Sequence, residues 1–188
     1  MAAYFRFSSF QKSLSLIIYS VETMSQIKVL TDNSKSFSII SDGNVIGTLN
    51  YKHWYSANIE ITIGEDNYTI TRKGFWGTLH EVRHEDEVVF MLKAQWDGGI
   101  AMIKPKDKEH FYELKAKGYF VNGYKLINYK GQEMLSITPD FSWNRVMPEY
   151  TISCSDNFGS TRIEQLIIAL SLYQYNAIQI MQMFAATN

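Results

Sequence analysis

The chain has a single cysteine, Cys154, among its 188 residues. One cysteine cannot form a disulfide bond within the chain, and this excludes the small secreted folds that disulfide bonds hold together. We therefore expect a protein of a reducing compartment, with a cytoplasmic location. Cys154 itself is predicted to be a small apolar residue of a strand.

The chain also lacks an excess of basic residues. Its 18 Lys and Arg stand against 19 Asp and Glu, which gives a formal net charge of -1. A dedicated nucleic-acid binder needs surplus Lys and Arg to displace the counterions of the phosphate backbone. Nucleic acid is therefore not a predicted partner.

The usual motifs of catalysis are missing as well. The sequence contains no glycine loop that cradles phosphate, no nucleophile elbow and no paired metal-binding cysteines. We predict neither an enzyme nor a bound cofactor. What the chain does have is aromatic residues, which make up 14% of it and suit strands and thick β-cores.

From Ile27 onward, apolar residues alternate with polar ones, and turn residues follow at short and regular intervals. This pattern is typical of antiparallel strands joined by hairpins. The turns are predicted at Ser41-Asp42-Gly43-Asn44, Gly64-Glu65-Asp66-Asn67, His84-Glu85-Asp86-Glu87, Asp97-Gly98-Gly99, Asn122-Gly123 and Lys130-Gly131. About twelve short strands in such a meander predict a closed antiparallel barrel, because closure removes exposed sheet edges.

The last stretch differs from all that precedes it. Residues 163–184 carry only one charge, at Glu164, and apolar side chains cover most sides of the predicted helix. Thr161 and Glu164 form a capping box that marks its start. We therefore predict an all-β fold with one long C-terminal helix, in which the barrel encloses the helix and is filled by it.

A membrane anchor is the alternative for this helix, since a span of roughly 33 Å also matches a bilayer. Six amide and hydroxyl residues argue against it, because their polar groups are costly in hydrocarbon. They are Gln165, Ser171, Gln174, Asn176, Gln179 and Gln182. The chain is thus not predicted to be an integral membrane protein.

The first residues are unlike the barrel sequence. Residues 1–23 contain apolar side chains at helical spacing, which predicts an amphipathic helix in an N-terminal extension. A signal peptide is the alternative, although no small-residue cleavage site follows the apolar run. Residues 24–188 are predicted to form the single barrel domain.

One enzyme motif does occur, since His80-Glu81-Val82-Arg83-His84 matches the H-E-x-x-H pattern of zinc proteases. That pattern works on a helix, where both histidines reach one metal ion and the glutamate lies beside its bound water. The alternation around His80 and His84 indicates a strand instead, on which the two would stand roughly 13 Å apart. A zinc hydrolase therefore remains only as an alternative function.

The segment Ser155-Asp156-Asn157-Phe158-Gly159, directly before the helix, resembles the D-N-F-G segment of phospholipid scramblases. With the barrel-and-helix pattern over residues 37–184, the chain resembles the tubby C-terminal-like superfamily, which includes scramblases and LURP-one-related proteins. This resemblance implies a barrel around a hydrophobic helix and a role at lipids. It also implies a calcium site, but only Asp156 matches, and calcium prefers six to eight oxygen ligands.

Five basic residues are the predicted lipid or phosphate site: Arg72, Lys73, Lys104, Lys106 and Lys108. The three lysines share a face if their stretch is extended, and each charge near an anionic membrane contributes about 1 kcal/mol. The alternative is a solvated surface of mixed charge, because acidic residues are interleaved with them.

We predict a non-enzymatic module that binds anionic phospholipid head groups or a membrane-associated protein. A protein-interaction scaffold without a lipid role is the alternative. The aromatic stretches His53-Trp54-Tyr55 and Phe75-Trp76 are predicted to pack the barrel ends, with contact at a membrane interface as the second interpretation.

Overall fold

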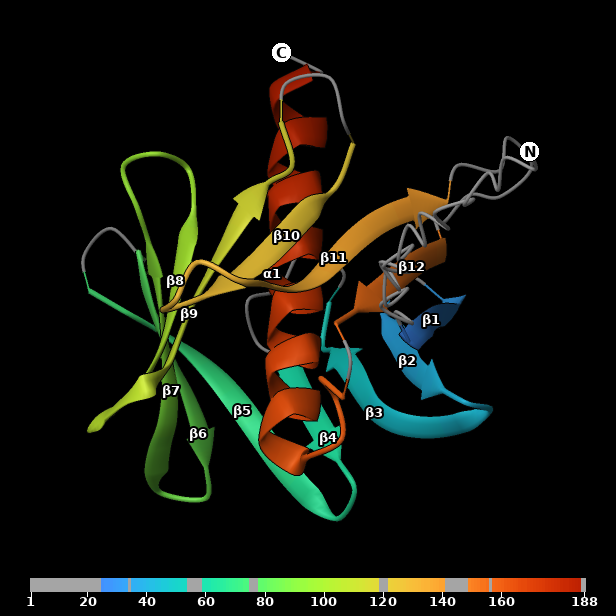
Figure 1. Ribbon diagram of the computed structural model, residues 1–188, viewed down its shortest axis with the longest axis horizontal. Coiled ribbons are helices and arrows are strands. Elements are labelled where there is room, and N and C mark those ends of the chain that lie inside the picture. Colours follow the sequence, from blue (N-terminus) through green and yellow to red (C-terminus); the bar gives the residue numbers. More distant parts are fainter. Residues whose placement is uncertain are drawn as a thin grey trace, which may run out of the picture.

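The computed structural model describes residues 25–33, 35–53, 59–74, 78–118, 122–140, 149–155 and 157–186. These contain twelve strands followed by one helix (Figure 1). The strands are β1 (Ser25–Asn33), β2 (Ser36–Ser41), β3 (Asn44–Tyr51), β4 (Ile59–Ile63), β5 (Asp66–Lys73), β6 (Leu79–His84), β7 (Glu87–Ala94), β8 (Ile100–Lys104), β9 (Asp107–Ala116), β10 (Tyr124–Asn128), β11 (Glu133–Asp140) and β12 (Glu149–Cys154), and the helix is α1 (Arg162–Ala186). The predicted extension of residues 1–23 lies outside the described residues.

The strands form a closed antiparallel barrel in which each strand pairs with the next one in the sequence. Closure occurs between β1 and β12, where Ile27 lies opposite Ile152 and Val29 lies opposite Tyr150. The described sheet therefore has no free edge. This arrangement confirms the predicted fold class.

Local turn chemistry explains much of the meander. In the β2–β3 hairpin, Asp42 and Gly43 both have positive φ angles, 49° and 79°. Two left-handed residues in succession give the tight turn whose twist matches antiparallel strands, and Asp-Gly is a favoured pair for it.

The prediction of a tight hairpin at Asn122-Gly123 is wrong. The first residue of β10, Tyr124, pairs with Ala116 of β9, so the connection between these strands is longer than two residues. Gly123 has another role, because a Cβ atom there would lie 2.2 Å from the backbone oxygen of Ile137. Glycine allows β11 to pass close by.

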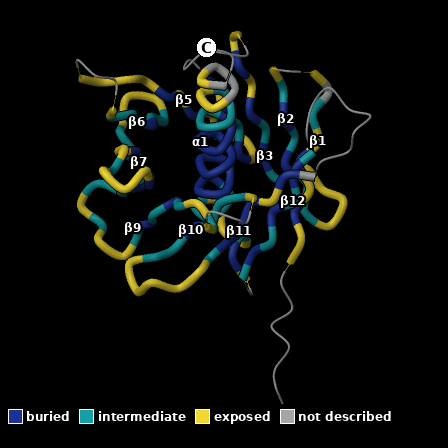
Figure 2. Tube along the Cα trace, turned by 90° about the horizontal axis from the view of Figure 1, so that it is seen from above, coloured by how far each residue is buried: buried dark blue, intermediate teal, exposed yellow. Residues whose placement is uncertain are grey.

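The helix α1 fills the barrel (Figure 1). Residues 166–176 are buried one after another, so three turns are enclosed on all sides (Figure 2). Inward-facing strand side chains such as Ile61, Val82 and Leu114 complete this core and are also fully buried. No helix of the described chain is both long and apolar enough to cross a bilayer.

The helix begins with the predicted capping box. The Thr161 hydroxyl accepts the Glu164 N–H at 3.3 Å, and the Glu164 carboxylate accepts the N–H groups of Thr161 and Gly159 at 3.0 and 3.2 Å. Arg162 then pairs with Asp66 of β5 at 3.0 Å. The N-terminal end of α1 is thereby fastened to one end of the barrel.

Polar side chains in the buried part of α1 form hydrogen bonds inside the barrel, although the Asn176 Oδ1 atom is buried without a partner among the described residues. Ser171 donates to the Ile167 carbonyl oxygen at 2.8 Å, and Asn176 donates to the Tyr51 hydroxyl at 3.3 Å. These bonds offset the cost of burying polar groups. Toward its C-terminal end the helix leaves the barrel, and Met181 is 62% exposed.

We expect Leu170→Ala to lower the free energy of unfolding by about 2–5 kcal/mol, because Leu170 is fully buried and its truncation leaves a cavity. Met181→Ala is the matched control on the exposed part of the same helix and should change it by less than about 0.5 kcal/mol. Urea denaturation followed by circular dichroism measures both.

Deleting everything after Gly159 extends this test. A truncated chain without α1 should not fold cooperatively, since the barrel interior would then be unfilled. A truncated chain that stays monomeric and unfolds in one sharp transition would contradict the role of α1 as the core.

Cys154 offers a second test of the enclosed core. Its side chain is fully buried at the end of β12, and burial raises the pKa of the thiol to about 12. A thiol that is both protonated at pH 8 and inaccessible should not react with iodoacetamide until the barrel unfolds. Mass spectrometry of the alkylated chain, with and without denaturant, measures this; rapid labelling of the native protein would show that the barrel opens.

Candidate functional site

The H-E-x-x-H residues lie on β6, as the alternation in the sequence predicts. His80, Val82 and His84 point toward the barrel interior, and fully buried Val82 separates the two histidines. Their four-residue spacing along a strand corresponds to roughly 13 Å. This separation is too large for both imidazoles to bind one metal ion.

The two histidines also have different surroundings. The His80 Nδ1 atom lies 3.3 Å from the Tyr173 hydroxyl of α1, at the inner wall of the barrel. The His84 Nδ1 atom lies 3.0 Å from the carbonyl oxygen of Asn67, beside the ring of Tyr68. His80 thus joins the barrel to its helix, and His84 joins β6 to β5.

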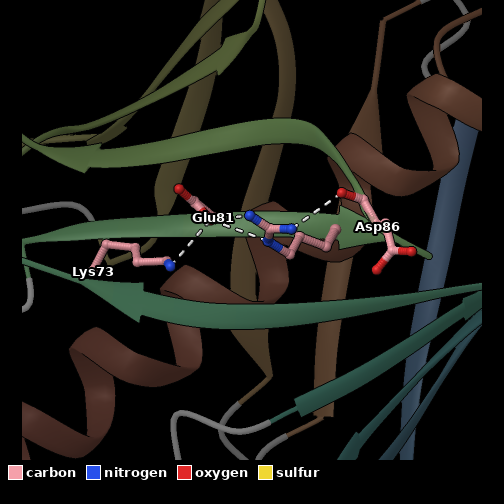
Figure 3. Close-up of polar contacts among 4 residues, drawn as sticks. Lys73, Glu81 and Asp86 are labelled. Atoms are coloured by element: carbon pink, nitrogen blue, oxygen red, sulfur yellow. Dashed lines mark hydrogen bonds and ion pairs between the residues drawn. The ribbon is translucent and has the colours of Figure 1, made fainter.

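Glu81, which would be the general base of a zinc protease, faces away from both histidines. Its carboxylate accepts hydrogen bonds from the Arg83 guanidinium, the shorter at 2.9 Å, and lies 3.8 Å from the Lys73 ammonium (Figure 3). Arg83 also donates to the carbonyl oxygen of Asp86 at 3.1 Å. This outward row of charges links β5, β6 and the β6–β7 turn on the outer surface of the barrel.

Metal ligands are not gathered elsewhere in the part of the chain that the structure describes. No three His, Cys, Asp or Glu side chains there are placed to hold one metal ion. Asp156, the residue that the scramblase resemblance offers for calcium, lies outside the described residues. Its neighbour Asn157 adopts a positive φ of 64° in the turn that leads into α1.

The structure separates the five predicted basic residues into two groups. Arg72 and Lys73 end β5, at the barrel end where α1 emerges, whereas Lys104, Lys106 and Lys108 surround the β8–β9 turn at the other end. The three lysines do not share the face of an extended strand, because residues 105 and 106 form a turn and Lys106 has a φ of 64°. The sequence could not show this turn, because Pro105, which lies between Lys104 and Lys106, is compatible with both a strand edge and a turn.

Arg72 lies at the mouth of the barrel. It is the register partner of His80, so both side chains are on the inner side of the sheet, next to Tyr173. Burial raises the pKa of Tyr173 to about 12, and the positive charge of Arg72 opposes that shift. Arg72 is itself exposed, and therefore carries its charge to the open end of the barrel.

Further cations line the same end, from β5 around to β10. Lys73 and Lys93 are both register partners of Leu79, so they flank it on the outer surface. We name this end the cationic rim, comprising Arg72, Lys73, Lys93, Lys117, Lys125 and Trp96. Of its cations, only Lys73 has an ion pair among the described residues.

Trp96 is the most exposed large apolar residue of the described chain, at 107% relative exposure. It stands in the β7–β8 turn, which is closed by hydrogen bonds from the Gln95 N–H to the Gly99 carbonyl oxygen at 2.8 Å and from the Gly99 N–H to Asp97 at 3.0 Å. Asp97 also pairs with Lys115 at 3.2 Å. The hydrogen bond from the Gly99 N–H, and then the Lys115 ammonium, lower the pKa of Asp97. The Asp97 carboxylate that holds this turn is therefore ionised at neutral pH.

Composition and periodicity did not identify Trp96, Lys93 or Lys125 as site residues. A tryptophan beside Asp97-Gly98-Gly99 was a usable signal, because a side chain in a tight turn cannot reach a barrel core. The aromatic residues Trp54, Tyr55, Phe75 and Trp76 of the predicted interface stretches lie outside the described residues, and His53 is exposed.

A hollow of about 470 Å³ on the outer wall of the barrel is lined by the other three residues of the predicted site, Lys104, Lys106 and Lys108. We name it the lysine groove and define it by Lys104, Lys106, Lys108, Met91, Ile103 and Phe111. Lys104 is paired with Asp107 at 3.3 Å, and the same carboxylate contacts His110 at 2.8 Å. Lys106 and Lys108 are exposed and form no ion pair within the described chain.

Comparisons of the chain with protein-family models, with curated proteins and with solved structures found no match.

The geometry of β6 leads to a prediction about zinc. Protein purified without chelator should contain much less than one equivalent of zinc, and His80→Ala should not change that content, since His80 and His84 cannot share an ion. Elemental analysis by mass spectrometry measures the metal. One equivalent of zinc that disappears in His80→Ala, but not in the control His110→Ala, would restore the hydrolase interpretation.

Proposed function

We propose that the chain is a non-enzymatic module that attaches peripherally to membranes rich in anionic phospholipids, with the cationic rim against the bilayer. The observation that carries this proposal is the placement of Trp96. A fully exposed tryptophan stands on the β7–β8 turn, at the barrel end that also carries Arg72, Lys93, Lys117 and Lys125, and these four cations form no ion pair with the described residues.

The two kinds of side chain on the rim suit the two layers of a membrane surface. Arg72, Lys93, Lys117 and Lys125 supply charge, and each cation near an anionic leaflet contributes about 1 kcal/mol. Trp96 supplies an amphipathic ring of the kind that concentrates at the head-group level. Reversible attachment generally takes more than one such contribution, and the rim offers both.

The projecting end of α1 supports the same orientation. Its C-terminal turns rise past the ends of the strands (Figure 1), and exposed Met181 lies on them. Gln179 and Gln182 of these turns line a hollow together with Tyr124 at the start of β10, which places the helix end beside the rim. An apolar side chain there adds area that a bilayer interface can cover.

The resemblance to the tubby C-terminal-like superfamily is in keeping with this proposal, because it too implies a lipid-directed barrel around a helix. That family assignment stays a prediction, as do the cytoplasmic location and the absence of enzymatic activity. A membrane-associated protein is the competing partner, since exposed tryptophan and arginine also anchor protein interfaces.

Vesicle sedimentation tests the proposal. The protein should sediment with phosphatidylcholine vesicles that contain phosphatidylserine or a phosphoinositide, and not with phosphatidylcholine alone. Binding should weaken steeply as salt rises from about 0.05 to 0.5 M, because the attraction between surface charges is screened. Arg72→Glu with Lys93→Glu should weaken it about tenfold or more, and Trp96→Ala should weaken it further.

The matched control is Lys106→Glu with Lys108→Glu, which makes the same change in net charge at the other end of the barrel. This variant should keep nearly all of its vesicle binding. Equal losses in the two double variants would mean that net charge, and not the rim, determines binding. No sedimentation with anionic vesicles at low salt would remove the membrane function and leave the protein-interaction alternative.

A further inference from the structure

The lysine groove has an apolar floor on a surface where an antiparallel barrel is usually polar. Met91 of β7 is the register partner of Ile103 of β8, and Ile103 is in turn the partner of Phe111 of β9. All three face outward, because the adjacent residues Leu92 and Tyr112 belong to the buried core. Three apolar side chains therefore touch across neighbouring strands without serving the interior.

The size of this groove suits a small molecule. Its volume of about 470 Å³ lies within the range of roughly 300–1,000 Å³ that is typical of ligand pockets. Tyr129 of the β10–β11 turn forms another wall and is 49% exposed. The Lys130 ammonium lies 5.2 Å from the centre of the Tyr129 ring, which adds a further positive charge nearby.

The charges at the edge of the groove define the ligand further. Lys104, Lys106 and Lys108 face a single lining carboxylate, that of Asp107, which is already engaged by Lys104 and His110. Within the described residues, the ammonium groups of Lys106 and Lys108 are consequently uncompensated beside an apolar floor. An anion satisfies those groups, and only an apolar body covers the floor.

We propose that the lysine groove binds a small anionic amphiphile, meaning a molecule with one carboxylate or phosphate group on an apolar body. The apolar body lies across Met91, Ile103 and Phe111, and the anionic group lies between Lys106 and Lys108. A neutral apolar molecule leaves both ammonium groups unpaired. This site is separate from the cationic rim and does not depend on the membrane function.

The fluorescent sulfonate 8-anilino-1-naphthalenesulfonate is a direct probe, because it combines one negative charge with aromatic rings. Titration of the full chain should give one saturable site per molecule. Dodecanoate should displace the probe, and dodecanol should compete about tenfold or more weakly, since it lacks the charge. Near-ultraviolet circular dichroism confirms that every variant tested is folded.

Lys106→Glu with Lys108→Glu should weaken probe binding about tenfold or more, whereas Arg72→Glu with Lys93→Glu should leave it unchanged. If the first pair impairs folding, Lys106→Asn with Lys108→Gln replaces it, because asparagine tolerates the left-handed backbone of residue 106. Ile103→Ser should weaken the binding of probe and dodecanoate alike.

Three results would overturn the proposal: no saturable site, equal competition by dodecanol and dodecanoate, or undiminished probe binding in both lysine double variants. Displacement by an acidic peptide that contains phenylalanine, without displacement by dodecanoate, would also overturn it and assign the groove to a protein partner. Loss of vesicle binding with intact probe binding would affect only the membrane function.

Discussion

The enclosure of α1 is the constraint on which the rest of the structure depends. A barrel of this size is too wide for its own side chains to fill, and a helix that is apolar on every side cannot remain in water. Each therefore requires the other. The fully buried residues of the strands, such as Ile61 and Leu114, have α1 as their packing partner, and Leu170 and Leu172 have the strands as theirs.

Because α1 fills the interior, binding sites of this barrel can lie only on its outer surface and at its ends. Many barrels hold ligands inside, but residues 166–176 occupy that space here and leave the outer wall and the ends. The capping box and the Arg162–Asp66 pair fasten one end of α1, so the opposite end is free to project. The cationic rim and the lysine groove are accordingly both surface features, built on strands that the core holds rigid.

Local patterns predicted the fold well because barrel and helix both follow from short-range rules. Period-two alternation identified the strands, and Thr161 with Glu164 marked the start of α1. The strand around His80 was recognised in the same way. The prediction of a tight turn at Asn122-Gly123 was wrong because Gly123 is required by the close approach of Ile137 in β11. A contact between residues distant in the sequence leaves no local pattern to recognise.

The site was predicted less well for the same reason. Lys104 and Arg72 were grouped by their charge, but the turn at residues 105 and 106 determines which way the three lysines face. The apolar floor of the groove depends on the register that sets Met91 beside Ile103 and Ile103 beside Phe111. Trp96 became a candidate only when its exposure was known.

The order of the chain has a consequence during synthesis. A ribosome makes all twelve strands before it makes α1. The barrel cannot close until β12 has been made, because β12 is the closing partner of β1. At about 5–20 residues per second, the inner faces of the early strands lack their packing partner for on the order of ten seconds. Nascent chains of this protein should therefore be substrates for chaperones that cover apolar β-strands until α1 has been made.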